Sequence, residues 1–200
     1  DGHGADGHRC AQFGRDHLAS KLRQLNDAHP GADLVKLLNT AHLAVNKAMH
    51  AAAFDDDMSG TTAINIAFRD GFMYVSNLGD SRAIVGVDNG DDGLVVQPLS
   101  FDQTPYRKDE RERCRAAGAR ILTISMLDGV EPIHDNFDVG LGEQIDEEGD
   151  PPRLWLPNAE VPGCAFTRSL GDAVAESIGC IGKPEIMQRE VDKVCARARR

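Results

Sequence analysis

Two short stretches of this sequence carry side chains that could do chemistry together. The first is DGHGADG, residues 1–7, in which Asp1 and His3 stand two positions apart among three glycines. Glycine allows backbone paths that are closed to other residues, so this string could place both polar groups at one point. The second is Gly79-Asp80, where a carboxylate follows a run of strand-forming residues. Carboxylate oxygens are ligands that Mg²⁺ and Mn²⁺ prefer, and an imidazole can transfer protons near neutral pH.

Taken alone, the first stretch is more simply a glycine-rich turn or a frayed chain end. Short strings of Asp, His and Gly carry a high risk of false matches. A catalytic interpretation therefore needs structural elements that bring Asp1, His3 and Asp80 to one place.

The stretch that positions Asp80 runs from Ser59 to Val85. Its apolar residues alternate with a period of two over 64–68, 72–78 and 83–87, which predicts three antiparallel strands. Both faces of these strands are apolar, so we expect one sheet that is covered on both sides by other layers. Asp80 then lies on a turn at the rim of that sheet.

Two amphipathic helices are predicted ahead of the sheet. The first covers about residues 8–26, with a stripe of leucines at helical spacing. The second follows Asp33, a suitable N-cap residue, and continues to about Ala48. Each helix has one apolar face to bury, and the sheet is the obvious partner.

The second half of the chain contains weaker signals. We expect a strand over 94–99 and a helix over 107–117 that is opened by Thr104-Pro105. Short strands are expected over 121–124 and 153–156, and the second of these returns to the sheet. A further strand breaks at Gly171-Asp172 and is followed by a short helical stretch. Residues 125–152 are acidic and irregular, and they are interpreted as a loop or insertion.

Length and composition narrow the classes of function. Two hundred residues make one ordinary domain, here 1–200, with enough chain to bury a core. The net charge of -10 argues against a binder of nucleic acid or anionic membranes, because those partners need a cationic face, but it permits bound divalent cations. The five cysteines show no C-x-x-C spacing, and the sequence shows neither a signal peptide nor a transmembrane run. We therefore expect a location in the cytoplasm or nucleus. We also expect a monomer.

Four segments, in this order, resemble the metal-dependent serine/threonine phosphatases of the protein phosphatase 2C family. They are DGHG at 1–4, SGTTA at 59–63 with LGDSRA at 78–83, LSFDQTP with its helix at 99–117, and FTRSLGD followed by KPEI at 166–186. Any one segment would be a weak match, but together they cover most of the chain.

The resemblance implies an α+β fold, an antiparallel β-sandwich with helices on both outer faces, in four layers. It also implies hydrolysis of phosphoserine and phosphothreonine in phosphorylated proteins by water activated at a binuclear Mg²⁺ or Mn²⁺ centre. By similarity, Asp1 bridges the two metals, Gly2 offers its backbone carbonyl, and Asp80 matches the ligand of a third, weaker metal. His3 matches the residue proposed to protonate the leaving alkoxide.

Departures from the family pattern limit this expectation. The strand that carries a glutamate ligand and a phosphate-binding arginine would precede Asp1, and the Asp-Gly and Asp-Asn motifs that complete the metal shell would follow Arg200. Asp128-Gly129 and Asp135-Asn136 precede FTRSLGD, which is the wrong order, so they are interpreted as loop residues. We therefore expect a fragment truncated at both ends that is itself inactive or weakly active. The alternative is a catalytically inactive pseudophosphatase that acts as a regulatory binding module, since the same fold can persist after metal ligands are lost.

Overall fold

The structure is a computed structural model that describes residues 1–88, 93–137 and 149–192. The helices are α1 (Gly7–Ala28), α2 (Leu34–Met49), α3 (Lys108–Ala116), α4 (Ile124–Leu127) and α5 (Ala173–Glu176). The strands are β1 (Gly2–His3), β2 (Gly60–Thr61), β3 (Ala63–Arg69), β4 (Phe72–Leu78), β5 (Ile84–Asp88), β6 (Leu94–Pro98), β7 (Arg120–Leu122), β8 (Arg153–Trp155), β9 (Pro162–Cys164), β10 (Leu170–Gly171) and β11 (Glu185–Glu190). The chain is therefore mixed α+β with antiparallel sheets, as the sequence predicted.

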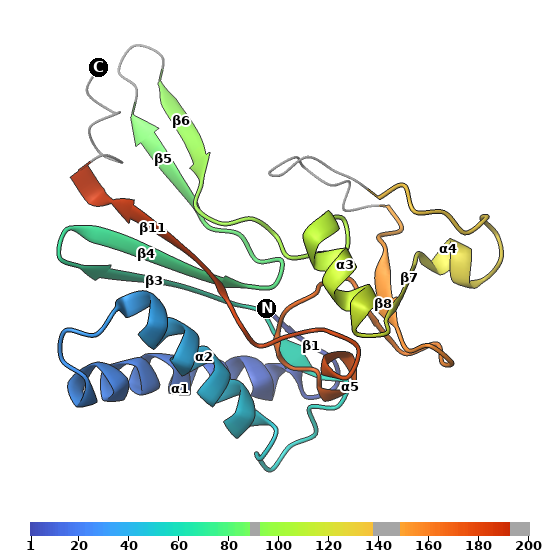
Figure 1. The fold of residues 1–200 in the computed structure, drawn as a ribbon, viewed down its shortest axis with the longest axis horizontal. Coiled ribbons are helices and arrows are strands. Elements are labelled where there is room, and N and C mark those ends of the chain that lie inside the picture. Colours follow the sequence, from blue (N-terminus) through green and yellow to red (C-terminus); the bar gives the residue numbers. More distant parts are fainter. Residues whose placement is uncertain (89–92, 138–148, 193–200) are drawn as a thin grey trace.

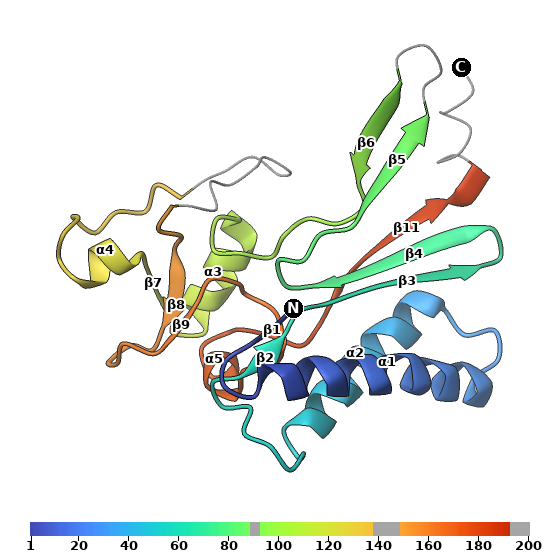
Figure 2. The same ribbon diagram turned by 180° about the vertical axis from the view of Figure 1, so that it is seen from behind.

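The two predicted N-terminal helices form and cover one face of the sheet β11-β4-β3 (Figures 1 and 2). The Asp33 carboxylate accepts a hydrogen bond from the Val35 backbone (2.9 Å), which confirms the predicted N-cap of α2. Three leucines of α2 are buried against this face, and each such side chain contributes about 1.5–3 kcal/mol when fully buried. They are Leu34, Leu37 and Leu38, in contact with Ala67 of β3, Tyr74 of β4 and Ile186 of β11.

The third predicted strand does not join this sheet. β4 pairs with β3 on one side and with β11 on the other, whereas β5 pairs with β6, Ile84 opposite Pro98. The expectation of one sheet for all three strands was wrong, because a period-two pattern identifies a strand but not its partner.

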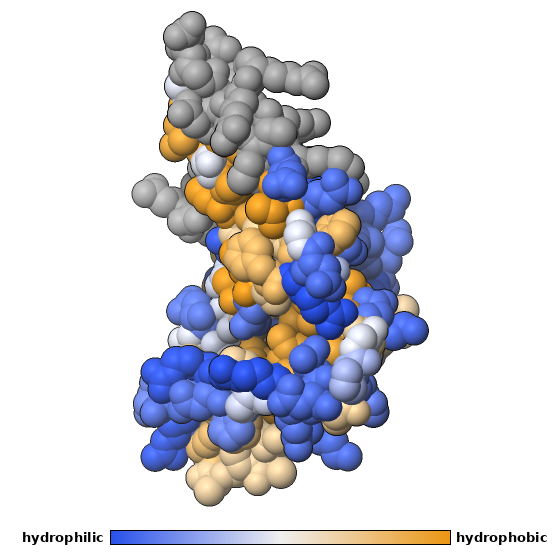
Figure 3. Space-filling view, turned by 90° about the vertical axis from the view of Figure 1, so that its left-hand side faces the viewer, coloured by the Kyte–Doolittle hydropathy of each residue, from blue (hydrophilic) through white to orange (hydrophobic). Residues whose placement is uncertain are grey.

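The β5-β6 hairpin is nevertheless the start of a second layer. Met73 and Val75 of β4 are buried in one cluster that also includes Val85 of β5 and Leu99 after β6. Several large apolar side chains on β3, β5 and β6 stay exposed, and Figure 3 shows apolar residues gathered on this end of the molecule. They include Ile66, Phe68, Ile84, Leu94 and Val96. The second layer is thus only partly built by the described residues.

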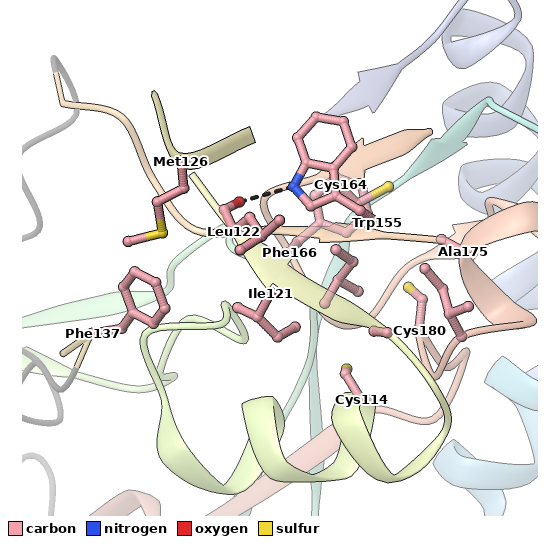
Figure 4. Close-up of a cluster of buried hydrophobic side chains, with 13 residues drawn as sticks. Cys114, Ile121, Leu122, Met126, Phe137, Trp155, Cys164, Phe166, Ala175 and Cys180 are labelled. Carbon is pink, nitrogen blue, oxygen red and sulfur yellow. Dashed lines mark hydrogen bonds between the residues drawn. The ribbon is translucent and has the colours of Figure 1, made fainter. Parts of the chain in front are cut away.

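A separate core lies between α3, the sheet β7-β8-β9 and α5 (Figure 4). Leu154 is fully buried there, and the Trp155 indole donates to the Leu122 carbonyl (2.9 Å). Residues 153–156 were expected to return to the main sheet, but β8 pairs with β7 and β9 instead. This unit holds the segment that leads into FTRSLGD.

Two boundaries in the second half also differ from expectation. α3 begins at Lys108 with Arg107 as N-cap, although Thr104-Pro105 was expected to open it. Thr123 caps α4 at the start of the predicted loop 125–152, of which residues 138–148 lie outside the described part. No helix among the described residues is both long and apolar enough to span a bilayer.

Candidate active site

A small sheet, β1-β2-β10, brings three of the sequence motifs together. Its central strand β2 pairs with β1 through His3 opposite Gly60, and with β10 through Gly171 opposite Gly60. DGHG, SGTTA and FTRSLGD, which are far apart in sequence, therefore meet at Gly60. The strands are two residues long, so the sheet depends on the elements around it, and α1 and α2 both pack against it.

The His3 imidazole is bound by the carboxylate of Asp172, the residue that follows β10. Nε2 of His3 lies 2.7 Å from Oδ2 and 2.9 Å from Oδ1. The His3 side chain is 28% exposed, whereas that of Asp172 is 2% exposed. The imidazole thus faces solvent on one side and rests on a buried carboxylate on the other.

The path of the backbone explains how Asp172 reaches His3. Asp172 has φ 55°, a left-handed conformation that is uncommon outside glycine, and its N–H donates to the Ser59 carbonyl (2.9 Å). Its carboxylate lies over Gly60, where an added Cβ would stand 2.0 Å from Oδ2. Glycine is therefore required in SGTTA to leave room for the carboxylate between the strands.

Asp1 is tied to the turn that carries Asp80 through Thr62. The Asp1 backbone nitrogen donates to Thr62 Oγ1 (2.9 Å), and the Asp1 carbonyl accepts from the Thr62 N–H (3.1 Å). Thr62 Oγ1 also shares a hydrogen bond of 2.7 Å with the hydroxyl of Ser81, the neighbour of Asp80. The opening aspartate and the carboxylate after β4 thus converge at one end of the main sheet.

Electrostatics give a second sign that Asp80 belongs to this site. Although the residue is exposed, desolvation by surrounding protein atoms raises the pKa of its carboxyl group, and the nearby Asp102 carboxylate raises it further. A backbone hydrogen bond of Asp80 and the charge of His3 act in the opposite direction on the Asp80 pKa. Asp80 therefore lies within electrostatic range of His3, and its partly desolvated negative charge would be stabilised by a bound cation.

One group of three acidic residues in the described part has ligand atoms within 4.8 Å of one another, and it lies elsewhere. It consists of Asp109, Glu110 and Glu185. Arg107 binds both Asp109 (2.7 Å) and Glu185 (2.8 Å), and Arg168 binds Glu110 (2.5 Å). Because arginines already balance these charges, we interpret the group as a structural ion-pair network.

The structure brings together all four residues predicted from the sequence. Asp1, Gly2 and His3 lie on or beside β1, and Asp80 lies on the turn that the hydrogen bonds of Thr62 and Ser81 connect to Asp1. Asp172 was missed as a site residue, although the sequence contained a signal, the Gly171-Asp172 break in a motif shared with the family. Its partner His3 is 169 positions away, so no local pattern could reveal the contact.

Comparison with known proteins agrees with this geometry. The family model described as "Protein phosphatase 2C" matches residues 1–194. "Probable protein phosphatase 2C 35" of Arabidopsis thaliana is 43% identical over 186 residues, which cover 93% of this chain and 52% of that protein. "Probable protein phosphatase 2C 72" of the same plant is 28% identical and is covered to 54%. The chain thus spans about half the length of these relatives.

Solved structures agree in fold. The serine-threonine phosphatase 2C from Toxoplasma gondii superposes with a TM-score of 0.68 at 16% identity, covering 96% of this chain and 62% of that one. A Caenorhabditis elegans sex-determining protein also gives a TM-score of 0.68, at 21% identity and 38% coverage of its chain. At these identities the likeness shows the fold alone.

Proposed function

Because this chain belongs to the protein phosphatase 2C family, we propose that it is part of an enzyme that removes phosphate from phosphoserine and phosphothreonine in proteins. The observation that carries the proposal is the small sheet that sets His3 against Asp172, together with the Thr62 bridge from Asp1 to the Asp80 turn. A carboxylate pair and a partly exposed imidazole at one rim suit hydrolysis of a phosphate ester.

The oxygen donors at this rim fit Mg²⁺ or Mn²⁺. Asp1 and Asp80 supply carboxylates and Gly2 a backbone carbonyl, the hard ligands that these cations prefer. We assign Asp1 as the residue shared by two cations, Gly2 as a carbonyl ligand and Asp80 as the ligand of a third. When bound, such cations would neutralise phosphate charge and lower the pKa of a coordinated water.

His3 serves as proton donor to the leaving group. The alkoxide of serine or threonine is a poor leaving group, and proton transfer to it by a positioned side chain contributes about 10²–10⁴-fold. His3 suits this role because its imidazole is anchored on one side and open to solvent on the other. A covalent intermediate is not required, which agrees with the burial of the four described cysteines, Cys10, Cys114, Cys164 and Cys180.

The test is hydrolysis of a phosphothreonine peptide by the full-length parent protein in the presence of Mn²⁺, with Asp1→Ala as the matched inactive variant. We expect activity that disappears in the variant and in excess chelator. An inactive parent protein would favour the alternative, a pseudophosphatase that acts as a binding module. Activity that survives Asp1→Ala would reject the metal-ligand assignment.

The 200-residue chain by itself should bind metal weakly and turn over little. The described residues offer two carboxylates and one carbonyl at the rim, fewer than the ligands of an octahedral ion. Calorimetry that shows tight binding of two cations to this chain would contradict that expectation. Action as a monomer, and a location in the cytoplasm or nucleus, stay predictions from the sequence.

A further inference from the structure

We propose that Asp172 is a positioning residue, which holds the His3 imidazole so that Nδ1 is the atom that faces the substrate. The inference rests on the proposed function, in which His3 gives a proton to the leaving group. It goes beyond that function by assigning a role to a carboxylate outside the predicted site, and by specifying which nitrogen transfers the proton.

The contact itself determines the tautomer. Both Asp172 oxygens lie within hydrogen-bond distance of Nε2, at 2.7 and 2.9 Å. An ionised carboxylate can only accept, so Nε2 must carry a hydrogen and donate it. In a neutral imidazole the unprotonated nitrogen is then Nδ1, and the described residues provide no hydrogen bond to that atom. In the protonated imidazolium form the second proton is then on Nδ1, and its transfer to the leaving alkoxide returns the ring to the neutral Nε2–H form.

Burial separates the two roles. Asp172 is 2% exposed, whereas the His3 side chain is 28% exposed. Substrate can therefore reach the imidazole but not the carboxylate beneath it. Asp172 can influence the reaction only through His3, which is why it is a positioning residue.

Two further contacts hold the ring in place. Phe166, from the buried core of Figure 4, stands with its ring centroid 4.5 Å from that of His3 at an interplanar angle of 43°. On the opposite strand, Gly60 leaves the space that the Asp172 carboxylate occupies. With the ring flanked by an aromatic side chain and anchored through Nε2, rotation of the imidazole is restricted.

The support of Asp172 extends into α2. Asn46, buried on α2, accepts from the Gly171 N–H (2.8 Å) and donates to Glu176 of α5 (2.6 Å). His50 at the end of α2 lies 3.2 Å from Glu176 as well. This polar cluster fixes both ends of the segment that carries Asp172, yet none of its side chains is bonded to His3 in the described structure.

The experiment compares two leaving groups in the full-length parent enzyme. A phosphothreonine peptide needs a proton on its departing alkoxide, whereas p-nitrophenyl phosphate releases an anion that is stable near neutral pH. We expect Asp172→Asn to lower kcat on the peptide by about 10–100-fold, as for loss of other orienting partners, and to change the aryl ester little. His3→Gln should show the same selectivity, more strongly.

The matched control is Glu176→Gln, the same change from carboxylate to amide at the far end of the short helix that follows Asp172. It leaves both hydrogen-bonding groups of the Asp172–His3 contact in place, so any change in kcat should be the same for the two substrates. The inference is overturned if His3→Gln is selective and Asp172→Asn is not. If the wild-type enzyme is inactive, or His3→Gln shows no selectivity, the proposed function fails instead.

A second readout does not depend on turnover. Nitrogen-15 chemical shifts of the His3 ring in the metal-free protein, recorded where the imidazole is neutral, report which nitrogen is protonated. We expect the Nε2–H form in wild type and a mixture of tautomers in Asp172→Asn. A predominant Nδ1–H form in wild type would contradict the proposal.

Discussion

Replacing Glu110 with glutamine should destabilise the fold strongly, because this carboxylate joins α3 to the FTRSLGD segment. Glu110 is 2% exposed and accepts hydrogen bonds from Arg168 (2.5 Å), from the Thr167 hydroxyl (2.5 Å) and from Arg113 (2.6 Å). All three partners donate, so the new amide NH₂ of glutamine would face at least one donor. The substitution keeps the shape of the side chain and removes its charge.

The size of the effect follows from the burial of the partners. Breaking a buried ion pair costs about 3–5 kcal/mol, because the remaining charge stays desolvated. The Arg168 side chain is 11% exposed and cannot easily rehydrate, whereas that of Arg113 is 29% exposed and can. We therefore expect a loss near the lower end, about 3 kcal/mol at neutral pH.

The loss should depend on pH in a defined direction. Burial opposes ionisation of Glu110, but the hydrogen bonds and charge of Arg168, with smaller contributions from Thr167 and Arg113, outweigh it and lower the pKa of the carboxyl group. A lowered folded pKa gives stability that is present above the unfolded pKa of about 4.3 and is lost as the pH falls through the folded value. The difference between wild type and variant should thus shrink as the pH falls below about 4.

Urea unfolding followed by the fluorescence of Trp155, the single tryptophan, measures the effect. Glu112→Gln is the matched control, since Glu112 lies on the same helix but is exposed, 3.9 Å from Lys108, and should change stability by less than about 0.5 kcal/mol. The reasoning is refuted if Glu110→Gln costs less than about 1 kcal/mol, or if its cost stays constant as the pH is lowered to 3.5.

Three further predictions concern packing. Gly60→Ala places a Cβ 2.0 Å from Asp172 Oδ2 and should cost about 1–3 kcal/mol, measured by urea unfolding; an unchanged midpoint would contradict the assigned position of Asp172. Leu154→Ala removes a fully buried side chain and should cost about 2–5 kcal/mol in the same assay, with a loss under about 1 kcal/mol as the contrary result. Burial raises the pKa of the Cys10 thiol to about 12 and that of Cys114 to about 11, so neither should react with a thiol reagent until the protein unfolds. Rapid labelling of the native protein at either site, located by mass spectrometry, would argue against the packing around that cysteine.

Elements in which the hydrophobic pattern repeats over many residues could be predicted from the sequence. α1, α2, β3 and β4 each repeat their pattern over five residues or more, and all four form where expected. The pattern does not show which strands pair with one another in a sheet. β5 was assigned to the wrong sheet because β11, more than ninety residues after β5 begins, takes the free edge of β4.

The site could be predicted only where its residues belong to short local motifs. Asp1, Gly2, His3 and Asp80 came from motifs, each recognisable over a few residues. The position of Asp172 depends on the pairing of the two-residue strand β10 with β2 at Gly60. Strands of two residues are too short to show an alternating pattern in the sequence. The requirement for glycine at that position becomes clear only when the carboxylate is placed above it.

The central claim is that Asp1, Gly2 and Asp80 hold divalent cations. Anomalous X-ray diffraction at the manganese edge, from crystals of the full-length protein grown with Mn²⁺, tests it most directly. The account predicts peaks about 2.0–2.3 Å from an Asp1 carboxylate oxygen and from the Gly2 carbonyl oxygen. Peaks confined to Asp109, Glu110 and Glu185, or no peak beside Asp1, would contradict it.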